Sequence, residues 1–173
     1  MAAGPLGEAR AAAGATVETF ALLEQAVQQA ASIRFVAVLP EVLRALAEGY
    51  LLASRLAEAR HSAERVLQLS RAQGQRHVEA DALRILGDVY ARANPDEAGQ
   101  AEAWYREALG VAEQIGTPPL AARCHLGLGV LFRATGQLES AQHHLATAAT
   151  MFLDMDMRSW LEKAQAEMDE GSR

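Results

Sequence analysis

The histidines and the single cysteine are the side chains of this sequence best suited to chemistry. Imidazole is the commonest metal ligand in proteins, and helical zinc sites place two histidines four residues apart with a glutamate between them. No pair of these histidines has that spacing, and adjacent residues on a helix point about 100° apart, so two neighbouring histidines cannot readily share one ion. The same angle separates Cys124 from His125, which argues against a nucleophile and its base. The five histidines are His61, His77, His125, His143 and His144.

Two further catalytic patterns are missing from the sequence. No serine lies in a G-x-S-x-G elbow, and no Gly-Lys pair occurs, without which the phosphate-binding loop G-x-x-x-x-G-K-[ST] cannot form. The carboxylates alternate with arginines, which is typical of charge that keeps a helical surface soluble. We therefore expect no enzymatic activity, no metal and no cofactor.

Charged residues form one distinctive pattern, acid, arginine, acid, at spacings of three and four residues. It occurs as Glu41, Arg44 and Glu48, and again as Asp81, Arg84 and Asp88. This spacing places the three side chains on one face of a helix, where they can form intrahelical salt bridges. Two interpretations stay open: the residues form a solvated charged face, or they contact a partner directly.

The elements that carry these residues are three copies of one helix pair. The copies span residues 42–69, 82–111 and 124–151, and the period is 40 or 42 because the middle copy has two extra residues in its turn at 94–98. In each first helix an aromatic residue follows a leucine by four positions, and in each second helix a core residue follows an alanine by four. The leucines are Leu46, Leu86 and Leu128; the aromatics are Tyr50, Tyr90 and Phe132; the second helices carry Ala59 and Ala63, Ala101 and Tyr105, and Ala141 and Leu145.

Apolar periodicity, prolines and glycines together predict the domain organisation. Gly74, Gly116 and Gly136 fall just past the ends of periodic segments, where a left-handed residue closes a helix. We expect helices at 16–32, 40–53, 55–72, 76–92, 96–115, 118–134, 138–153 and 156–169. A flexible lead-in would cover 1–15 and a single repeat domain 16–173, with repeats at 40–74, 80–116 and 118–154, a partial N-terminal helix at 16–32 and a cap at 156–169 anchored by Trp160. The predicted fold class is all-α, a right-handed solenoid of antiparallel helix pairs with a C-terminal capping helix.

Composition and charge narrow the functional classes. Alanine occupies 37 positions and aromatic residues make up 5%, a balance that favours closely packed helices over sheets. The net charge of −6 argues against nucleic acid or an anionic membrane as a partner, because such binding needs a basic surface. No apolar stretch approaches the roughly 20 residues of a membrane span, and a single cysteine cannot form an internal disulfide. We therefore expect a cytoplasmic protein.

The first helix of each copy, with its leucine, small residue and aromatic, and the second, with Ala-x-x-x-aromatic-x-x-Ala, resemble the tetratricopeptide repeat. The match is best at Leu86, Gly87 and Tyr90, and at Leu128, Gly129 and Phe132. The tryptophan usual early in the first helix is replaced by Leu43, Leu83 and His125, and the period exceeds the usual one of about 34 residues. The resemblance implies stacked helix pairs that bind a peptide on a concave surface formed by the first helices.

Residues 21–166 also resemble the C-terminal repeat region of large bacterial signalling ATPases, some of which carry a class III nucleotide-cyclase domain. The resemblance rests on the stretches EAWYREALGVAEQIG, RCHLGLGVLFRATGQLESAQHHL and MDMRSWLEKAQAEM. In that family a P-loop ATPase precedes the repeats, and only the repeat region has a counterpart in this sequence. The resemblance implies a role in bacterial signalling or regulation.

These observations predict a non-catalytic scaffold that binds a protein or peptide segment in its concave groove. The acid, arginine, acid pattern breaks in the third copy, where Leu126 and Val130 are left on a face that should otherwise be polar. Such apolar residues rimmed by arginine would suit an acidic or mixed acidic and apolar partner. Alternatively, the C-terminal helix or a loop covers them. The candidate partner-binding residues are Arg44, Glu48, Arg84, Asp88, Arg92, Leu126, Val130 and Arg133. A second class stays open, in which the chain self-associates, for example as a homodimer, or regulates a larger ATPase or cyclase protein.

Overall fold

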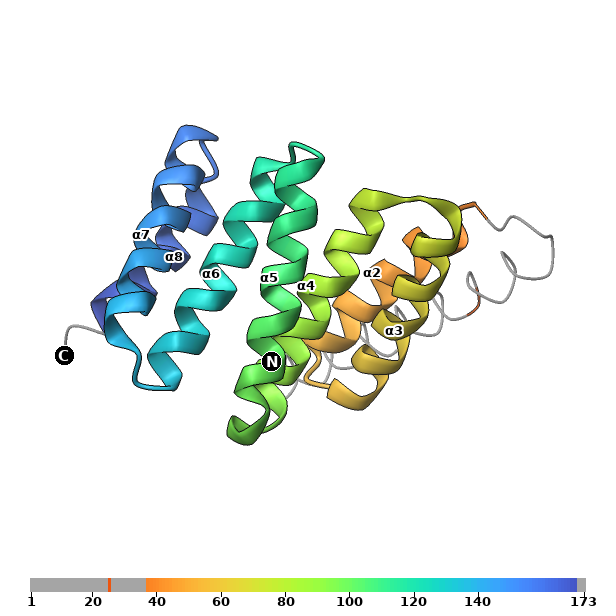
Figure 1. Cartoon of the computed structure of the whole chain (residues 1–173), viewed down its shortest axis with the longest axis horizontal. Coiled ribbons are helices and arrows are strands. Elements are labelled where there is room, and N and C mark those ends of the chain that lie inside the picture. Colours follow the sequence, from red (N-terminus) through yellow and green to blue (C-terminus); the bar gives the residue numbers. More distant parts are fainter. Residues whose placement is uncertain (1–24, 26–36, 171–173) are drawn as a thin grey trace, which may run out of the picture.

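The computed structural model describes Gln25 and residues 37–170 of the 173-residue chain (Figure 1). Residues 37–170 contain helices and turns and no strand. The elements are α2 (Leu39–Leu52), α3 (Leu56–Gln73), α4 (Arg76–Ala93), the 3-10 turn η1 (Pro95–Glu97), α5 (Ala98–Gln114), α6 (Pro118–Ala134), α7 (Leu138–Asp154) and α8 (Arg158–Glu170). The expected lead-in at 1–15 and helix at 16–32 lie outside the described residues, except for Gln25, which is helical.

The helices stack in chain order from α2 and α3 to α7 and α8 (Figure 1). Each helix packs against the next one, and in addition α2 lies against α4 and α4 against α6. The first helices of the three pairs, α2, α4 and α6, therefore form one layer. The structure confirms the predicted all-α solenoid of antiparallel helix pairs.

Residues in the left-handed conformation end the second helix of every pair. Gly74, Gly116 and Asp156 have φ values of 67°, 66° and 52°, and they lie at equivalent positions of the repeat. Left-handed backbone costs a residue with a Cβ more than it costs glycine, so glycine was the only signal available for these turns in the sequence. Asp156 shows that the same turn forms without glycine. These three residues fix the alignment of the copies independently of their helix faces.

The two extra residues of the middle copy are absorbed in its turn, as the period predicts. Pro95–Glu97 form a 3-10 turn, and the Oδ1 atom of Asn94 accepts a hydrogen bond of 3.1 Å from the backbone N–H of Asp96. Helix α5 consequently begins at Ala98 and not at the expected residue 96. Both helix faces of the middle copy keep their register.

The repeated leucines and aromatics form the core. All six of these side chains are buried in one cluster that runs from Leu39 to Ala141. A second cluster lies under α8, where Ala164 is buried beside Leu145 and Phe152 of α7. Trp160 stacks on Phe152 with ring centroids 5.8 Å apart, so it anchors α8 as expected. Burying apolar surface of this kind contributes about 25 cal/mol for each Å² removed from water.

Three glycines let helices of adjacent layers approach closely. A Cβ atom added to Gly87 of α4 or to Gly127 of α6 would lie 2.7 Å or 2.5 Å from the ring of Tyr105, which therefore fits between these two helices. A Cβ atom on Gly129 would lie 2.6 Å from Cγ of Leu145. Gly87 and Gly129 therefore lie at close helix contacts, and Tyr105 is held on both sides.

Candidate functional site

Arg84 is the centre of an ionic network that joins α2 and α4. Its side chain is 4% exposed, and its guanidinium donates to Asp81 Oδ1 at 3.1 Å, to Asp88 Oδ2 at 2.6 Å and to Glu48 Oε1 at 3.0 Å. The first two bonds are the intrahelical pairs that the spacing predicts. The bond to Glu48 crosses to the preceding repeat, so the charged pattern also connects one helix pair to the next.

Two further arginines extend the network over three helices. Arg44 of α2 pairs with Glu41 at 2.9 Å and lies 3.6 Å from Asp81 of α4. Arg123 of α6 donates to Glu48 Oε1 and lies 3.7 Å from Asp81. Glu48 and Asp81 are thus shared between arginines of different helices, and α2, α4 and α6 are tied together by charge.

Burial and the neighbouring charges shift the pKa values of this network in opposite directions, and the neighbouring charges have the larger effect. Burial alone would lower the pKa of Arg84, but Asp88, Asp81 and Glu48 raise it well above its ordinary value. Burial would likewise raise the pKa of Glu48, and the guanidiniums of Arg84 and Arg123 lower it. The groups are therefore ionised at neutral pH, and each buried charge has a partner, as a stable buried ion pair requires.

Tyr105 connects the network to the packing of the second helices. Its hydroxyl group donates a hydrogen bond to Asp88 Oδ1, the oxygen atom that Arg84 does not use. Burial raises the pKa of this phenol well above 10, and the neighbouring Asp88 carboxylate adds to the effect. The hydroxyl group therefore remains a proton donor at neutral pH. The ring of Tyr105 sets the helix spacing while its hydroxyl group satisfies a carboxylate.

Leu126 and Val130 do not form the exposed apolar patch that the concave-face model requires. Leu126 is 4% exposed and half-buried Val130 packs on the same cluster, with Ala164 and Met168 of α8 as neighbours. The alternative, in which the C-terminal helix covers this part of α6, is therefore the arrangement in the structure. The physical reason is that α8 packs on α6 and α7 as one further first helix and needs an apolar surface to pack against.

The remaining candidate residues lie in two places. Arg44, Glu48, Arg84 and Asp88 belong to the ionic network, each with at least one charged partner. Arg92 is exposed and donates to the backbone oxygen of Leu51 at 3.2 Å, which links α4 to the end of α2. Arg133 lies apart from the network, at the C-terminal end of α6.

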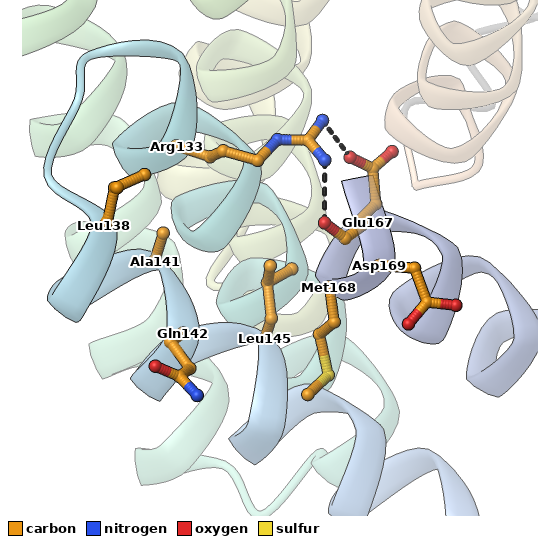
Figure 2. Close-up of a pocket in the computed structure, with 8 residues that line it drawn as sticks. All are labelled: Arg133, Leu138, Ala141, Gln142, Leu145, Glu167, Met168 and Asp169. Atoms are coloured by element: carbon orange, nitrogen blue, oxygen red, sulfur yellow. Dashed lines mark hydrogen bonds and ion pairs between the residues drawn. The ribbon is translucent and has the colours of Figure 1, made fainter. Parts of the chain in front are cut away.

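Arg133 forms one wall of a pocket of about 330 Å³ between α6, α7 and α8 (Figure 2). Its guanidinium donates to the backbone oxygen of Glu167 at 2.7 Å, pairs with the carboxylate of the same residue, and lies 3.3 Å from Glu170 Oε2. The pocket is lined by Arg133, Leu138, Ala141, Gln142, Leu145, Glu167, Met168 and Asp169. Apolar and charged groups meet here on three separate helices. Arg133 is one of the candidate residues predicted from the sequence, but the pocket is not predicted. Its one signal in the sequence is the change from Tyr105 to Leu145 at equivalent positions.

Two histidines contact each other between α6 and α7. The Nδ1 atoms of His125 and His144 are 2.8 Å apart, so one ring donates to the other. Burial lowers the pKa of both, and the neighbouring imidazoles His125 and His143 contribute to a value of about 4 for His144. In the part of the chain that the structure describes, no three or more His, Cys, Asp or Glu side chains are placed to hold a metal ion.

The pair predicts a pH dependence. Between pH 6.5 and about pH 4, the folded state keeps His144 neutral while the unfolded chain binds a proton there, so stability falls as pH falls. Arg106 and Glu102 also act on His144, and they oppose each other. Urea unfolding at about pH 6.8 and pH 4.8 should therefore show a smaller loss for His144→Gln than for the wild type. Equal losses would contradict the assignment of this pH dependence to His144.

Cys124 carries no reactive thiol. Burial raises its pKa to about 12, and the nearby Arg84 lowers it only in part. The thiolate, which is the nucleophilic form, is therefore scarce at neutral pH. Cys124 is a packing residue of α6.

The fold defines a helical-repeat protein, and among the described residues no helix is long and apolar enough to cross a bilayer. The structure is similar to the crystal structure of the apo form of RapI, with a TM-score of 0.73 at 14% sequence identity. The similarity covers 91% of this chain and 44% of the RapI chain, so this chain spans less than half of RapI. No family model matches the sequence, and no curated protein matches it at a significant level. At this identity the similarity to RapI concerns the fold.

Proposed function

We propose that this chain is a non-catalytic scaffold that binds a protein segment on the layer formed by α2, α4 and α6. The observation that carries the proposal is the ordered charge on that layer. Its carboxylates keep part of their side chains exposed, from 19% at Asp81 to 38% at Glu41, while the arginines between them hold each in place. A partner that meets preordered charges loses little entropy in ordering them, which favours binding.

The charge left open on this layer is acidic. Arg84, 4% exposed, is enclosed by carboxylates, and Arg44 and Arg123 are both paired within the network. The arginines suggested an acidic partner in the sequence, but their charge is directed to the chain's own carboxylates. A segment with lysine or arginine complements the carboxylate edges that remain. We therefore propose a basic partner segment.

The setting of this function rests on the second resemblance. The likeness of residues 21–166 to the repeat regions of bacterial signalling ATPases supports a role in signalling or regulation, in the cytoplasm. The similarity to RapI covers 91% of this chain but 44% of the RapI chain. This agrees with a repeat region that can form part of a longer protein.

Selection from a random peptide library displayed on phage tests the proposed function. The wild-type protein should enrich peptides rich in lysine and arginine, and Glu41→Lys should weaken their binding by at least about tenfold, because reversing a charge that faces a basic segment creates repulsion. Glu58→Lys on α3 is the matched control, since Glu58 also pairs with an arginine three residues away but lies on a second helix. Fluorescence anisotropy with a labelled selected peptide gives the Kd. Equal binding by both variants would place the partner elsewhere.

A further inference from the structure

The pocket beside Arg133 lies at a junction that the repeat forms three times. At each junction a second helix faces the first helix of the next pair, and the left-handed residues Gly74, Gly116 and Asp156 align the three. Tyr105 meets Gly127 at the second junction, and the residues at the equivalent positions are Ala63 and Ile85 at the first and Leu145 and Glu167 at the third. The three junctions therefore differ in the side chains that fill them.

The first two junctions are complementary in size. Small Ala63 is combined with large Ile85, and both are fully buried. At the second junction the sizes are reversed, because the ring of Tyr105 occupies the space that Gly127 leaves. Each of these two positions therefore carries one large buried side chain, Ile85 at the first and Tyr105 at the second.

The third junction has no side chain that closes it. Leu145 is shorter than Tyr105, and the side chain of Glu167 turns to Arg133 and away from Leu145 (Figure 2). A pocket of about 330 Å³ remains at this place, large enough for one big side chain. Its inner surface is made by Ala141, Leu145 and Met168, which are apolar.

The rim of the pocket combines an exposed leucine with acidic charge. Leu138, the first residue of α7, is 59% exposed and lines the pocket. Arg133 is the positively charged residue that lines the pocket, and it is already paired with Glu167 and Glu170. Asp169, at the rim, is exposed. These four groups carry one positive and three negative charges. A cationic neighbour is therefore favoured at the rim.

We propose that this pocket binds a large apolar or aromatic side chain from a basic segment of a partner protein. The side chain occupies the space that the Tyr105 ring occupies one junction earlier, against Leu145 and Met168. Lysine or arginine beside it in the partner segment meets Asp169 and the carboxylates around Arg133. This inference rests on the proposed scaffold function and adds to it an anchor site on a separate part of the surface.

The phage-displayed random peptide library selected on the wild-type protein also tests the pocket. The pocket variant is Leu138→Ser with Asp169→Lys, which removes the exposed leucine and reverses the rim charge at two exposed positions. The matched control is Leu153→Ser with Asp154→Lys, at the opposite end of α7, where Leu153 is 64% exposed. Enriched peptides should carry a large apolar residue flanked by basic residues. They should bind the pocket variant at least about tenfold more weakly and the control unchanged.

Other results separate the pocket from the scaffold function. Peptides that bind the pocket variant normally but lose affinity for Glu41→Lys would overturn the pocket proposal and leave the scaffold function standing. A library that yields no binder would overturn both. A wild-type protein that sediments as a dimer, with a monomeric pocket variant, would show that a second copy of the chain occupies the pocket and would overturn the proposed partner. Equal urea midpoints of the two variants exclude misfolding as the cause of a loss.

Discussion

Replacing Arg84 with methionine is expected to lower the free energy of unfolding by about 3 to 5 kcal/mol, the range for breaking a buried ion pair by removing one partner. Methionine keeps much of the length of the side chain but provides no donor. Glu48 and Asp81 retain Arg44 and Arg123 as partners, whereas in the described part of the chain Asp88 pairs with no other guanidinium. Most of the loss should therefore arise at Asp88, because the Tyr105 hydroxyl group would be the partner that its carboxylate retains.

Urea unfolding at pH 7, followed by the circular dichroism of the helices, measures this loss. Arg92→Met is the control, because Arg92 lies on the same helix, is exposed and donates one hydrogen bond to a backbone oxygen. Its replacement should cost less than about 1.5 kcal/mol. If the two variants had the same midpoint, the network would be a surface feature with little effect on stability.

The second large effect is expected at Tyr105 and Gly127. Tyr105→Ala removes a ring held between α4 and α6 and should cost about 3 to 5 kcal/mol. Gly127→Ile forces a side chain into that ring and should cost about 1 to 3 kcal/mol or more. The double variant should be more stable than the sum of the two losses predicts, because the equivalent positions of the first junction hold a small and a large buried residue, Ala63 and Ile85. The coupling should be at least about 1 kcal/mol.

A double-mutant cycle in urea measures this coupling. Gly110→Ile is a suitable control for the effect of isoleucine in a helix, since nothing lies within 4 Å of a Cβ atom added at Gly110. The control should be close to neutral. Strict additivity of Tyr105→Ala and Gly127→Ile would mean that the two positions do not share one space. The missing tyrosine ring would then no longer explain the neighbouring pocket.

Periodicity was sufficient to predict the helices and their pairing. The leucines and aromatics of the first helices recur with the spacing of one helix face, and these positions are buried in the structure. The turn at 94–98 was assigned by the change in period, and it contains the 3-10 turn. Glycine marked two of the three closing turns between pairs but not the third, where Asp156 is left-handed.

The contacts made by the surface of the first helices could not be predicted from each helix taken by itself. Spacings of three and four predict pairs within a helix, but no local pattern shows that Glu48 of α2 also meets Arg84 and Arg123. Leu126 and Val130 looked exposed because their own helix suggests an outward face. Whether α8 covers them depends on how the last helix packs, which is a property of the assembled stack.

The contact between Glu48 and Arg123 also has a consequence for cooperativity. In a linear array whose units touch only their nearest neighbours, the end units can melt while the others stay folded. Here α2 and α6 are joined directly although 75 residues separate the two side chains. Unfolding of α6 would take the Arg123 guanidinium away from Glu48 in the first copy and from Asp81 in the second. Partial unfolding from that end would therefore also destabilise the helices that remain folded. We expect the three helix pairs to unfold in one cooperative step, as a globular domain does, and not one repeat after another.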